Sequence, residues 1–403
     1  MSSEFQQRDP AYEVPQDEPV PEWIINEALL INEAIDKGKV TTIRAEAARG
    51  EEGAIFENKE ILEVMKNLVE PCFYIEYPPE NLEGQDRGSA LLKMFKSKFT
   101  DESGKEWEIG DYMADKNEAV SICMSTLDES TAEAIRYLNE KKVPVVAWVV
   151  VEDAEGYWTN KTNIKETTLK TDQILEWAKE HDIHLRAVGF DMEKPVNFLS
   201  NIAQANIVEM AKALIEYKKN VAEAAKNGDP QVMFDALLHR LNEEGVETEI
   251  YTFPRGMKGL LGGMEVTSPD NKRIIEMVYT NGIPTGLQGG AFKLLRSESA
   301  IPAFGIASGD ETETPGRDFA RISEANRTGQ PLLEVEKGPI PKHLSEEELG
   351  ILIDAWLDQE INIGDRTFKS REMYLFAMNN ARVALMLSNA LEAAFDKQKE
   401  KAK

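Results

Sequence analysis

His184-Leu-Arg-Ala-Val-Gly-Phe-Asp-Met-Glu-Lys-Pro195 is an apolar run that ends abruptly in two acids and a proline. Such a run is typical of a strand buried on both faces of a parallel sheet. Because side chains alternate along a strand, Asp191 and Glu193 are expected on the same face, about 6.5–7 Å apart along it. The alternative is that Asp191 caps the next helix and Glu193 is solvated.

Short apolar runs alternate with longer amphipathic ones on both sides of this stretch, which predicts βαβ units and a parallel sheet. Eight runs are expected to be strands: Cys72–Tyr77, Ala119–Met124, Val143–Val151, Leu185–Phe190, Glu247–Phe253, Ile274–Tyr279, Ile301–Ile306 and Met373–Ala377.

Helical spacing of apolar residues predicts helices between and around these strands. The expected helices are Glu22–Lys37, Ser130–Lys141, Thr171–His181, Asn201–Lys226, Gln231–Glu244, Ser345–Gln359 and Asn380–Lys397. Ser345-Glu-Glu-Glu348 has the arrangement of a capping box. Residues 1–21 are rich in Pro, Glu, Asp and Gln and are expected to form a disordered tail ahead of one domain, 22–403.

Eight such runs predict a closed (β/α)₈ TIM-type barrel, although an open doubly wound sheet has the same local pattern. We favour the barrel because the runs span nearly the whole chain and no Gly-rich nucleotide loop follows the first strand. Residues 78–118 and 307–344 are expected to be long connections that build binding surfaces. Two Gly-rich stretches, 256–263 and 286–290, lack the spacing of a phosphate cradle and are expected to be mobile lids.

Strand ends at the carboxyl end of a barrel form the floor of its active site. Two carboxylates held there resist being ionised together, so the pKa of one is expected to be raised. The protonated acid can then donate a proton near neutral pH while its neighbour stays anionic, which is the division of labour in glycoside cleavage.

Val188-Gly-Phe-Asp-Met-Glu193 resembles the end of the fourth barrel strand in chitinase-type glycoside hydrolases, where an Asp-x-Asp-x-Glu series ends in the proton donor. Glu249-Ile-Tyr-Thr-Phe-Pro254 resembles their fifth strand, and Glu276-Met-Val-Tyr-Thr280 their sixth, which ends in Met-x-Tyr. The order and rough spacing agree over about residues 119–306. The resemblance implies a glycosidase in which Glu193 protonates the leaving oxygen, Asp191 orients an N-acetyl group, and Tyr279 hydrogen-bonds that acetamide.

Three positions depart from the family pattern. Arg186 and Gly189 replace the two earlier aspartates, and Thr280 replaces the Asp that commonly follows the tyrosine. A strand-borne Asp-x-Glu also resembles lysozymes built on an incomplete barrel. The departures favour an alternative, a carbohydrate-binding barrel without activity. A third possibility is a metal-dependent barrel enzyme with Asp191, Glu193 and Glu76 as oxygen ligands.

Aromatic side chains are expected to line a sugar site, because the apolar face of a pyranose stacks on a ring. Trp148 lies in the third strand, where a core position is the simpler interpretation, while Tyr157 and Trp158 lie in the polar loop that follows. Tyr251 and Arg255 are at the end of the fifth strand.

Glu76 is a further acid, inside the first predicted strand. It could bind a hydroxyl or act as a second carboxylate across the mouth, but the simpler interpretation is an edge strand with Glu76 outward. Glu152, Asp153 and Asp310 are expected to be solvated loop charges.

Composition excludes several classes of function. The formal net charge of −26 argues against a nucleic-acid partner, and a neutral or cationic ligand, here a carbohydrate, fits better. The charges are mixed in sign, as on a solvated surface. The four histidines are scattered, so no histidine metal site is expected, and no motif calls for a cofactor. Cys72 and Cys123, in apolar runs, are expected to be buried free thiols.

No stretch has the length and apolarity of a membrane span, and the N-terminus has no apolar signal region. We expect a cytoplasmic protein as numbered, or a secreted or anchored one if a leader was removed.

Overall fold

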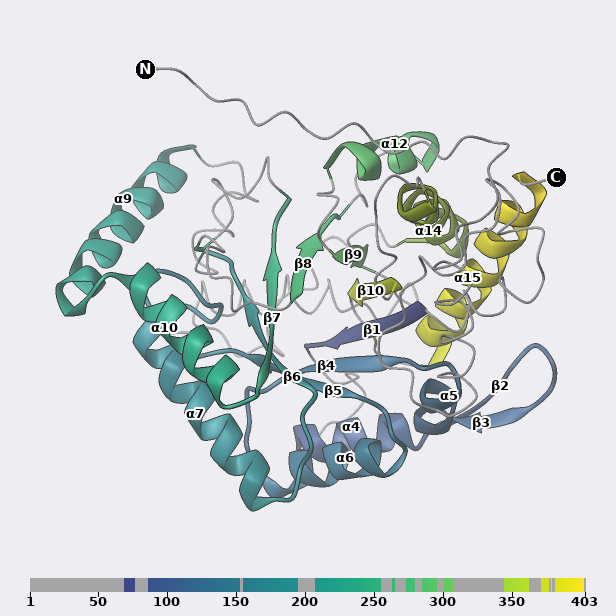
Figure 1. Cartoon of the computed structure of the whole chain (residues 1–403), viewed down its shortest axis with the longest axis horizontal. Coiled ribbons are helices and arrows are strands. Elements are labelled where there is room, and N and C mark those ends of the chain that lie inside the picture. The colour runs from purple at the N-terminus through teal and green to yellow at the C-terminus, as the bar shows by residue number, and fades with distance from the viewer. Residues whose placement is uncertain are drawn as a thin grey trace, which may run out of the picture.

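Eight parallel strands close into a barrel in the computed structural model, which describes residues 69–76, 86–152, 155–194, 207–254, 263–264, 273–279, 285–295, 301–306, 344–361, 371–376, 378 and 381–401 (Figure 1). The strands are β1 (Val69–Ile75), β4 (Ala119–Cys123), β5 (Val145–Val149), β6 (Ala187–Asp191), β7 (Glu247–Thr252), β8 (Arg273–Met277), β9 (Ile301–Ile306) and β10 (Arg371–Phe376). They follow the eight predicted runs in order.

Closure of the barrel depends on β1, which pairs with β4 on one side and with β10 on the other, both in parallel. Every strand therefore has two hydrogen-bonded neighbours, and the prediction of a closed barrel over an open sheet is confirmed. The expectation that β1 is an edge strand with Glu76 outward is wrong for the same reason.

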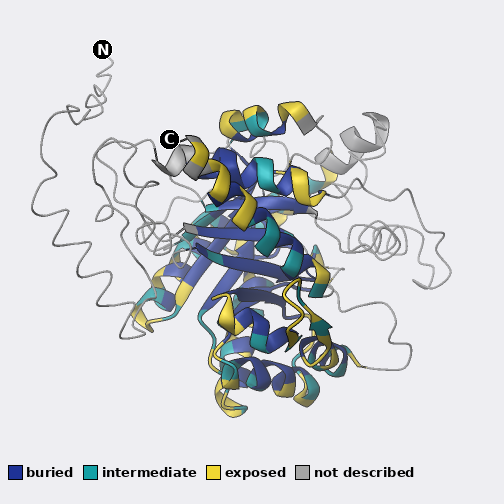
Figure 2. Ribbon diagram, turned by 90° about the vertical axis from the view of Figure 1, so that its right-hand side faces the viewer, coloured by how far each residue is buried: buried dark blue, intermediate teal, exposed yellow. Residues whose placement is uncertain are grey.

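Helices pack around the barrel, and buried side chains fill both faces of the strands (Figure 2). The longer helices are α4 (Arg87–Phe95), α6 (Glu129–Glu140), α7 (Ile164–Glu180), α9 (Ile207–Ala224), α10 (Pro230–Glu243), α12 (Thr285–Leu295), α14 (Glu346–Ile361) and α15 (Ala381–Lys401). α9 projects from the barrel at the left of Figure 1 and leads through the short turn Ala225–Asn227 into α10.

Alternation along the strands separates two apolar clusters. Residues such as Val188 and Phe190 face outward to the helices, whereas Tyr74, Trp148 and Tyr251 belong to a second cluster inside the barrel. Parallel strands covered on both faces need apolar residues on both, which explains their continuous apolar sequences.

Two predicted loops contain regular structure. The expected connection 78–118 includes α4, α5 (Ile109–Asp115) and an antiparallel hairpin of β2 (Lys98–Thr100) with β3 (Glu106–Glu108). The stretch 286–290, expected to be a mobile lid, lies inside α12. Residues 1–37 and 307–343, with the predicted tail, first helix and second long connection, lie outside the described residues, as do Asp153 and Asp310.

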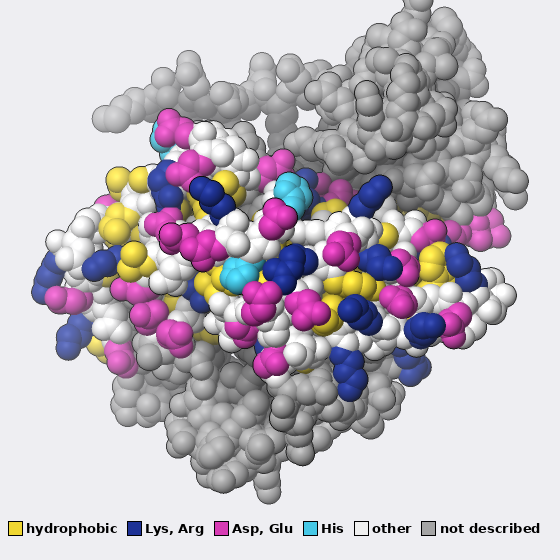
Figure 3. Space-filling model, turned by 90° about the horizontal axis from the view of Figure 1, so that it is seen from below, with side chains coloured by type: hydrophobic (Ala, Val, Ile, Leu, Met, Phe, Trp, Pro, Cys, Tyr) yellow, Lys and Arg dark blue, Asp and Glu magenta, His cyan; other side chains and the backbone are white. Residues whose placement is uncertain are grey.

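Several local predictions are confirmed. The Ser345 amide donates to the Glu348 carboxylate at 3.1 Å and the Glu348 amide to the Ser345 hydroxyl at 3.2 Å, a reciprocal capping box at the start of α14. Cys72 and Cys123 are free and buried. Acidic and basic side chains are interspersed over the face in Figure 3. No helix in the described part of the chain has the length and apolarity to cross a bilayer.

Candidate active site at the carboxyl end of the barrel

Asp191 and Glu193 lie inside the barrel at its mouth, which we define as the end formed by the carboxyl ends of the eight strands. Asp191 is the last residue of β6, and Glu193 follows two positions later. Phe190 precedes Asp191, and Met192 lies between the two acids. Both pack outward in the helix-facing cluster. Both acids are buried, so the expectation that Glu193 is solvated is wrong.

The buried position changes the proton affinity of both acids. Burial, followed by the charges of Glu193 and Glu76, holds the pKa of Asp191 well above its ordinary value. Burial, followed by the charge of Glu76, raises the pKa of Glu193 to about 8. At neutral pH Glu193 is therefore a carboxylic acid with a proton to donate.

Among the described residues, three buried polar atoms on the mouth side of the barrel interior lack a hydrogen-bond partner: Asp191 Oδ1, the Tyr74 hydroxyl and Trp148 Nε1. A buried polar atom without a partner costs about 1–3 kcal/mol, so such atoms in one place are typical of a binding site rather than of a packed core. They offer one carboxyl oxygen and two donors to a ligand.

Glu76 comes directly after β1, which lies three strands from β6 around the ring. It is 2% exposed, and the Tyr157 hydroxyl donates to its Oε1 at 3.0 Å. The same hydroxyl is 3.5 Å from the Cys123 sulfur, at the end of β4. Three strand ends thus contribute to one polar group of side chains at the mouth.

Tyr279 lies two residues beyond the end of β8, and its ring is 6.3 Å from that of Phe376 on β10. The residue keeps 37% of its surface exposed, yet the surrounding protein desolvates its hydroxyl. This desolvation, followed by the charges of Asp191, Glu193 and Glu76, raises the pKa of Tyr279 well above its ordinary value. The charges of the acid pair thus act on Tyr279, and its role in binding an acetamide stays a prediction.

The predicted aromatic plates are buried. Trp148 faces the barrel interior, and Tyr157 and Trp158 pack edge to face with ring centroids 5.4 Å apart. Tyr251 is fully buried, and its hydroxyl points away from the mouth to Ser121 at 2.9 Å and Glu249 at 3.1 Å. Arg255 lies outside the described residues.

Gly189 explains the position of Tyr251. A Cβ at residue 189 would lie 2.2 Å from the Tyr251 hydroxyl, so the phenol occupies the space that any larger residue on β6 would need. The Tyr251 side chain of β7 thus occupies the space beside Gly189, where the family series has an aspartate.

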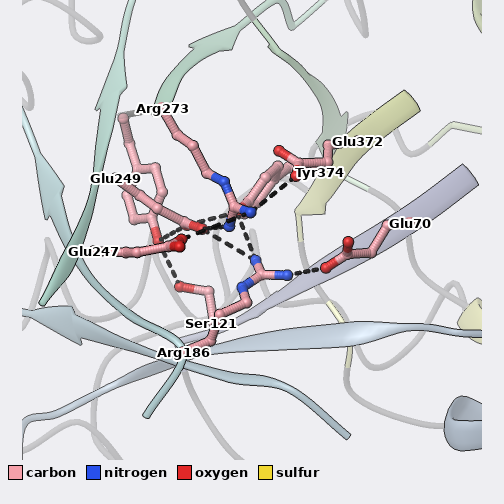
Figure 4. Close-up of polar contacts among 9 residues, drawn as sticks. Glu70, Ser121, Arg186, Glu247, Glu249, Arg273, Glu372 and Tyr374 are labelled. Carbon is pink, nitrogen blue, oxygen red and sulfur yellow. Dashed lines mark hydrogen bonds and ion pairs between the residues drawn. The ribbon is translucent and has the colours of Figure 1, made fainter. Parts of the chain in front are cut away.

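Beneath the mouth, at the amino ends of the strands, a buried ionic cluster fills the barrel (Figure 4). Glu249 is fully buried and accepts from Arg186 and Arg273, each at 3.0 Å, and from Tyr374 at 2.5 Å. Arg186 also pairs with Glu70, and Arg273 with Glu372 at 3.0 Å. We call these residues the closed-end cluster: Glu70, Arg186, Glu249, Arg273, Glu372 and Tyr374.

Sequence reasoning missed Tyr74 and the closed-end cluster. The signal was present in β1, because Glu70, Cys72, Tyr74 and Glu76 alternate with apolar residues and so share one face. Within the described ranges, no three His, Cys, Asp or Glu residues are grouped so that they could share a metal ion.

No protein-family model and no curated protein matches the sequence. Solved structures similar to the chain are barrels of low sequence identity. The spore cortex-lytic enzyme SleL of Bacillus megaterium is 12% identical, with a TM-score of 0.40, 80% of this chain covered and 73% of that chain. A chitinase of Chromobacterium violaceum is 11% identical, with a TM-score of 0.37 and coverage of 80% and 98%.

An endo-beta-mannanase/endo-beta-glucanase of Prevotella bryantii is 8% identical, with a TM-score of 0.40, and the match covers 83% of this chain and 49% of that one.

Proposed function

We propose that the chain is a glycoside hydrolase acting on a polysaccharide or glycoconjugate, with Glu193 as general acid and Asp191 as its partner. The observation that carries the proposal is a buried carboxyl at the mouth of a barrel whose pKa is raised to about 8 by burial and by Glu76. Cleavage of a glycosidic bond needs an acid that still holds its proton at neutral pH, beside a second carboxyl group.

Atoms without a partner support a substrate rich in hydroxyl groups. Asp191 Oδ1 can accept from a sugar hydroxyl or amide, and Tyr74 and Trp148 can each donate to a sugar oxygen. Tyr279 adds a partly exposed ring beside the acids.

The experiment is to assay the wild type and Glu193→Gln against a broad panel of polysaccharides and aryl glycosides. Hydrolysis of the polysaccharides is measured by the release of reducing ends. Because general acid catalysis contributes roughly 10²–10⁴-fold, Glu193→Gln should lose at least about 10²-fold in kcat while binding oligosaccharides with unchanged Kd. Glu152→Gln is the matched control, since it removes an exposed carboxylate just beyond the adjacent strand β5.

Hydrolysis by Glu193→Gln at the wild-type rate would exclude Glu193 as the acid. Glycan affinity of the wild type without any release of reducing ends would instead support the binding barrel.

A further inference from the structure

The inference concerns Glu76 and Tyr157, two residues that the proposed mechanism does not use. We infer that Glu76, held by the Tyr157 hydroxyl, is a positioning residue at the mouth that acts through the Glu193 carboxyl. The inference rests on the proposed function only for its effect on turnover.

Topology places Glu76 at the same end of the barrel as the acid pair, three strands around the ring. β1 and β6 are separated by β4 and β5 on one side of the ring, and Glu76 and Glu193 both follow the carboxyl ends of their strands. Tyr74 and Cys72 on the same strand face point into the barrel, so Glu76, in the same alternation, does as well. A carboxylate buried there acts across protein rather than across water, where charges interact more strongly.

The loop after β5 is built to hold Glu76. Tyr157 has a φ of 62°, a left-handed conformation that is uncommon for a bulky residue, and Gly156 before it has a φ of 109°. The Tyr157 carbonyl accepts from the Val151 amide at 3.0 Å, which ties the turn back to β5. Strain of this kind costs on the order of 1–3 kcal/mol and is typical of positions fixed for function.

This backbone conformation places the Tyr157 phenol where it donates a hydrogen bond to Glu76. Tyr157 is nine-tenths or more buried, and its hydroxyl lies 3.0 Å from Glu76 Oε1. A donor at this distance stabilises the carboxylate anion that accepts it. The hydrogen bond therefore fixes the position of the Glu76 carboxyl at the mouth.

The Glu76 carboxyl acts on the titratable groups around it. Its charge contributes to the raised pKa values of Asp191, Glu193 and Tyr279, and the neighbouring carboxyls of Asp191 and Glu193 also act on each other. The charged and titratable groups facing this region from the described elements are Tyr74, Arg87, Cys123, Tyr157, Lys161, Asp191, Glu193, Lys194 and Tyr279.

A direct titration of Glu193 tests the inference without any substrate. Glutamate carboxyl carbons are labelled with ¹³C, and the Glu193 signal is assigned by its loss in Glu193→Gln. In Glu76→Gln the midpoint of the Glu193 titration should fall by about one pH unit or more, because a like charge has been removed. The control Glu152→Gln should leave that midpoint unchanged.

Tyr157→Phe is the second variant, which keeps the ring and removes the hydroxyl. It should lower the same midpoint by less than Glu76→Gln does, and it serves if Glu76→Gln does not fold. An unchanged Glu193 midpoint in the folded variants would overturn the inference.

Failure of the proposed function has a different signature. If Glu193→Gln turned over substrate normally while Glu76→Gln still shifted the Glu193 midpoint, the glycosidase would be wrong and the electrostatic role of Glu76 would stand.

Discussion

Burial of the Glu193 side chain raises its pKa, and the same burial makes the free energy of unfolding depend on pH. The pKa of Glu193 is about 8 in the folded chain, against an ordinary value of 4.5. Between these two values the folded state holds a proton that the unfolded state has released. The free energy of unfolding therefore falls as pH rises through this range.

Glu193→Gln should accordingly make stability less dependent on pH. We expect the variant to unfold at the wild-type temperature near pH 4 and at a higher temperature than the wild type at pH 9, because a neutral amide replaces a buried carboxylate. Thermal unfolding followed by circular dichroism from pH 4 to 9 measures this. A wild-type Tm profile parallel to that of the variant would contradict the raised pKa.

At the residue scale, sequence alternation was sufficient to predict that Asp191 and Glu193 lie on the same face, since residues two positions apart in a strand point the same way. It was insufficient for Glu76, because alternation within β1 does not show which face of the strand is turned into the barrel. Nor could it show that Tyr157 adopts a positive φ and that its hydroxyl reaches Glu76. Both depend on contacts between segments far apart in the chain.

At the scale of the elements, helix α4 lies close to the start of helix α6 at Gly88. A Cβ there would lie 2.1 Å from the backbone of Ser130 and Thr131, at the start of α6. Gly88→Ala must therefore separate two helices rather than move a side chain, and we expect a loss of about 1–3 kcal/mol in the free energy of unfolding, measured with urea.

Gly290→Ala in α12 is the matched control, because nothing lies within 4 Å of the Cβ it would add. It should stabilise the helix by roughly 0.5–1 kcal/mol. Equal stabilities for the two variants would contradict the close approach at Gly88.

The sequence predicted the strands better than the connections. Each strand is a run of buried apolar residues, which is a local signal. The described part of residues 78–118 contains two helices of seven to nine residues and a hairpin of three-residue strands, and elements this short give little sequence signal. Gly286, Gly289 and Gly290 suggested a loop, but packing of α12 on α14 overrides their low helix propensity.

In the whole molecule, the closed-end cluster links strands from both ends of the described chain. Glu249→Gln should cost about 3–5 kcal/mol, since it leaves Arg186 and Arg273 buried with less compensating charge. Glu247→Gln is its control on the same strand, because Glu247 is 51% exposed and 3.8 Å from Arg273. That change should cost less than about 1 kcal/mol in urea unfolding. Equal losses would show that the buried charges are dispensable.

Closure of the barrel was predictable from the number of apolar runs and the lack of a nucleotide loop, and it holds. The ionic filling of its interior was not predictable, because Glu70, Arg186 and Arg273 occupy strand ends where charged residues are usually solvated.

Pairing of β1 with β10 has a consequence for synthesis on the ribosome. Until β10 has emerged, the nascent chain carries β1 with one side open and Arg186 without the final members of its cluster. Such an intermediate has an exposed strand that can join other chains, so protection by a chaperone during translation should matter more for this protein than for one assembled from neighbouring hairpins.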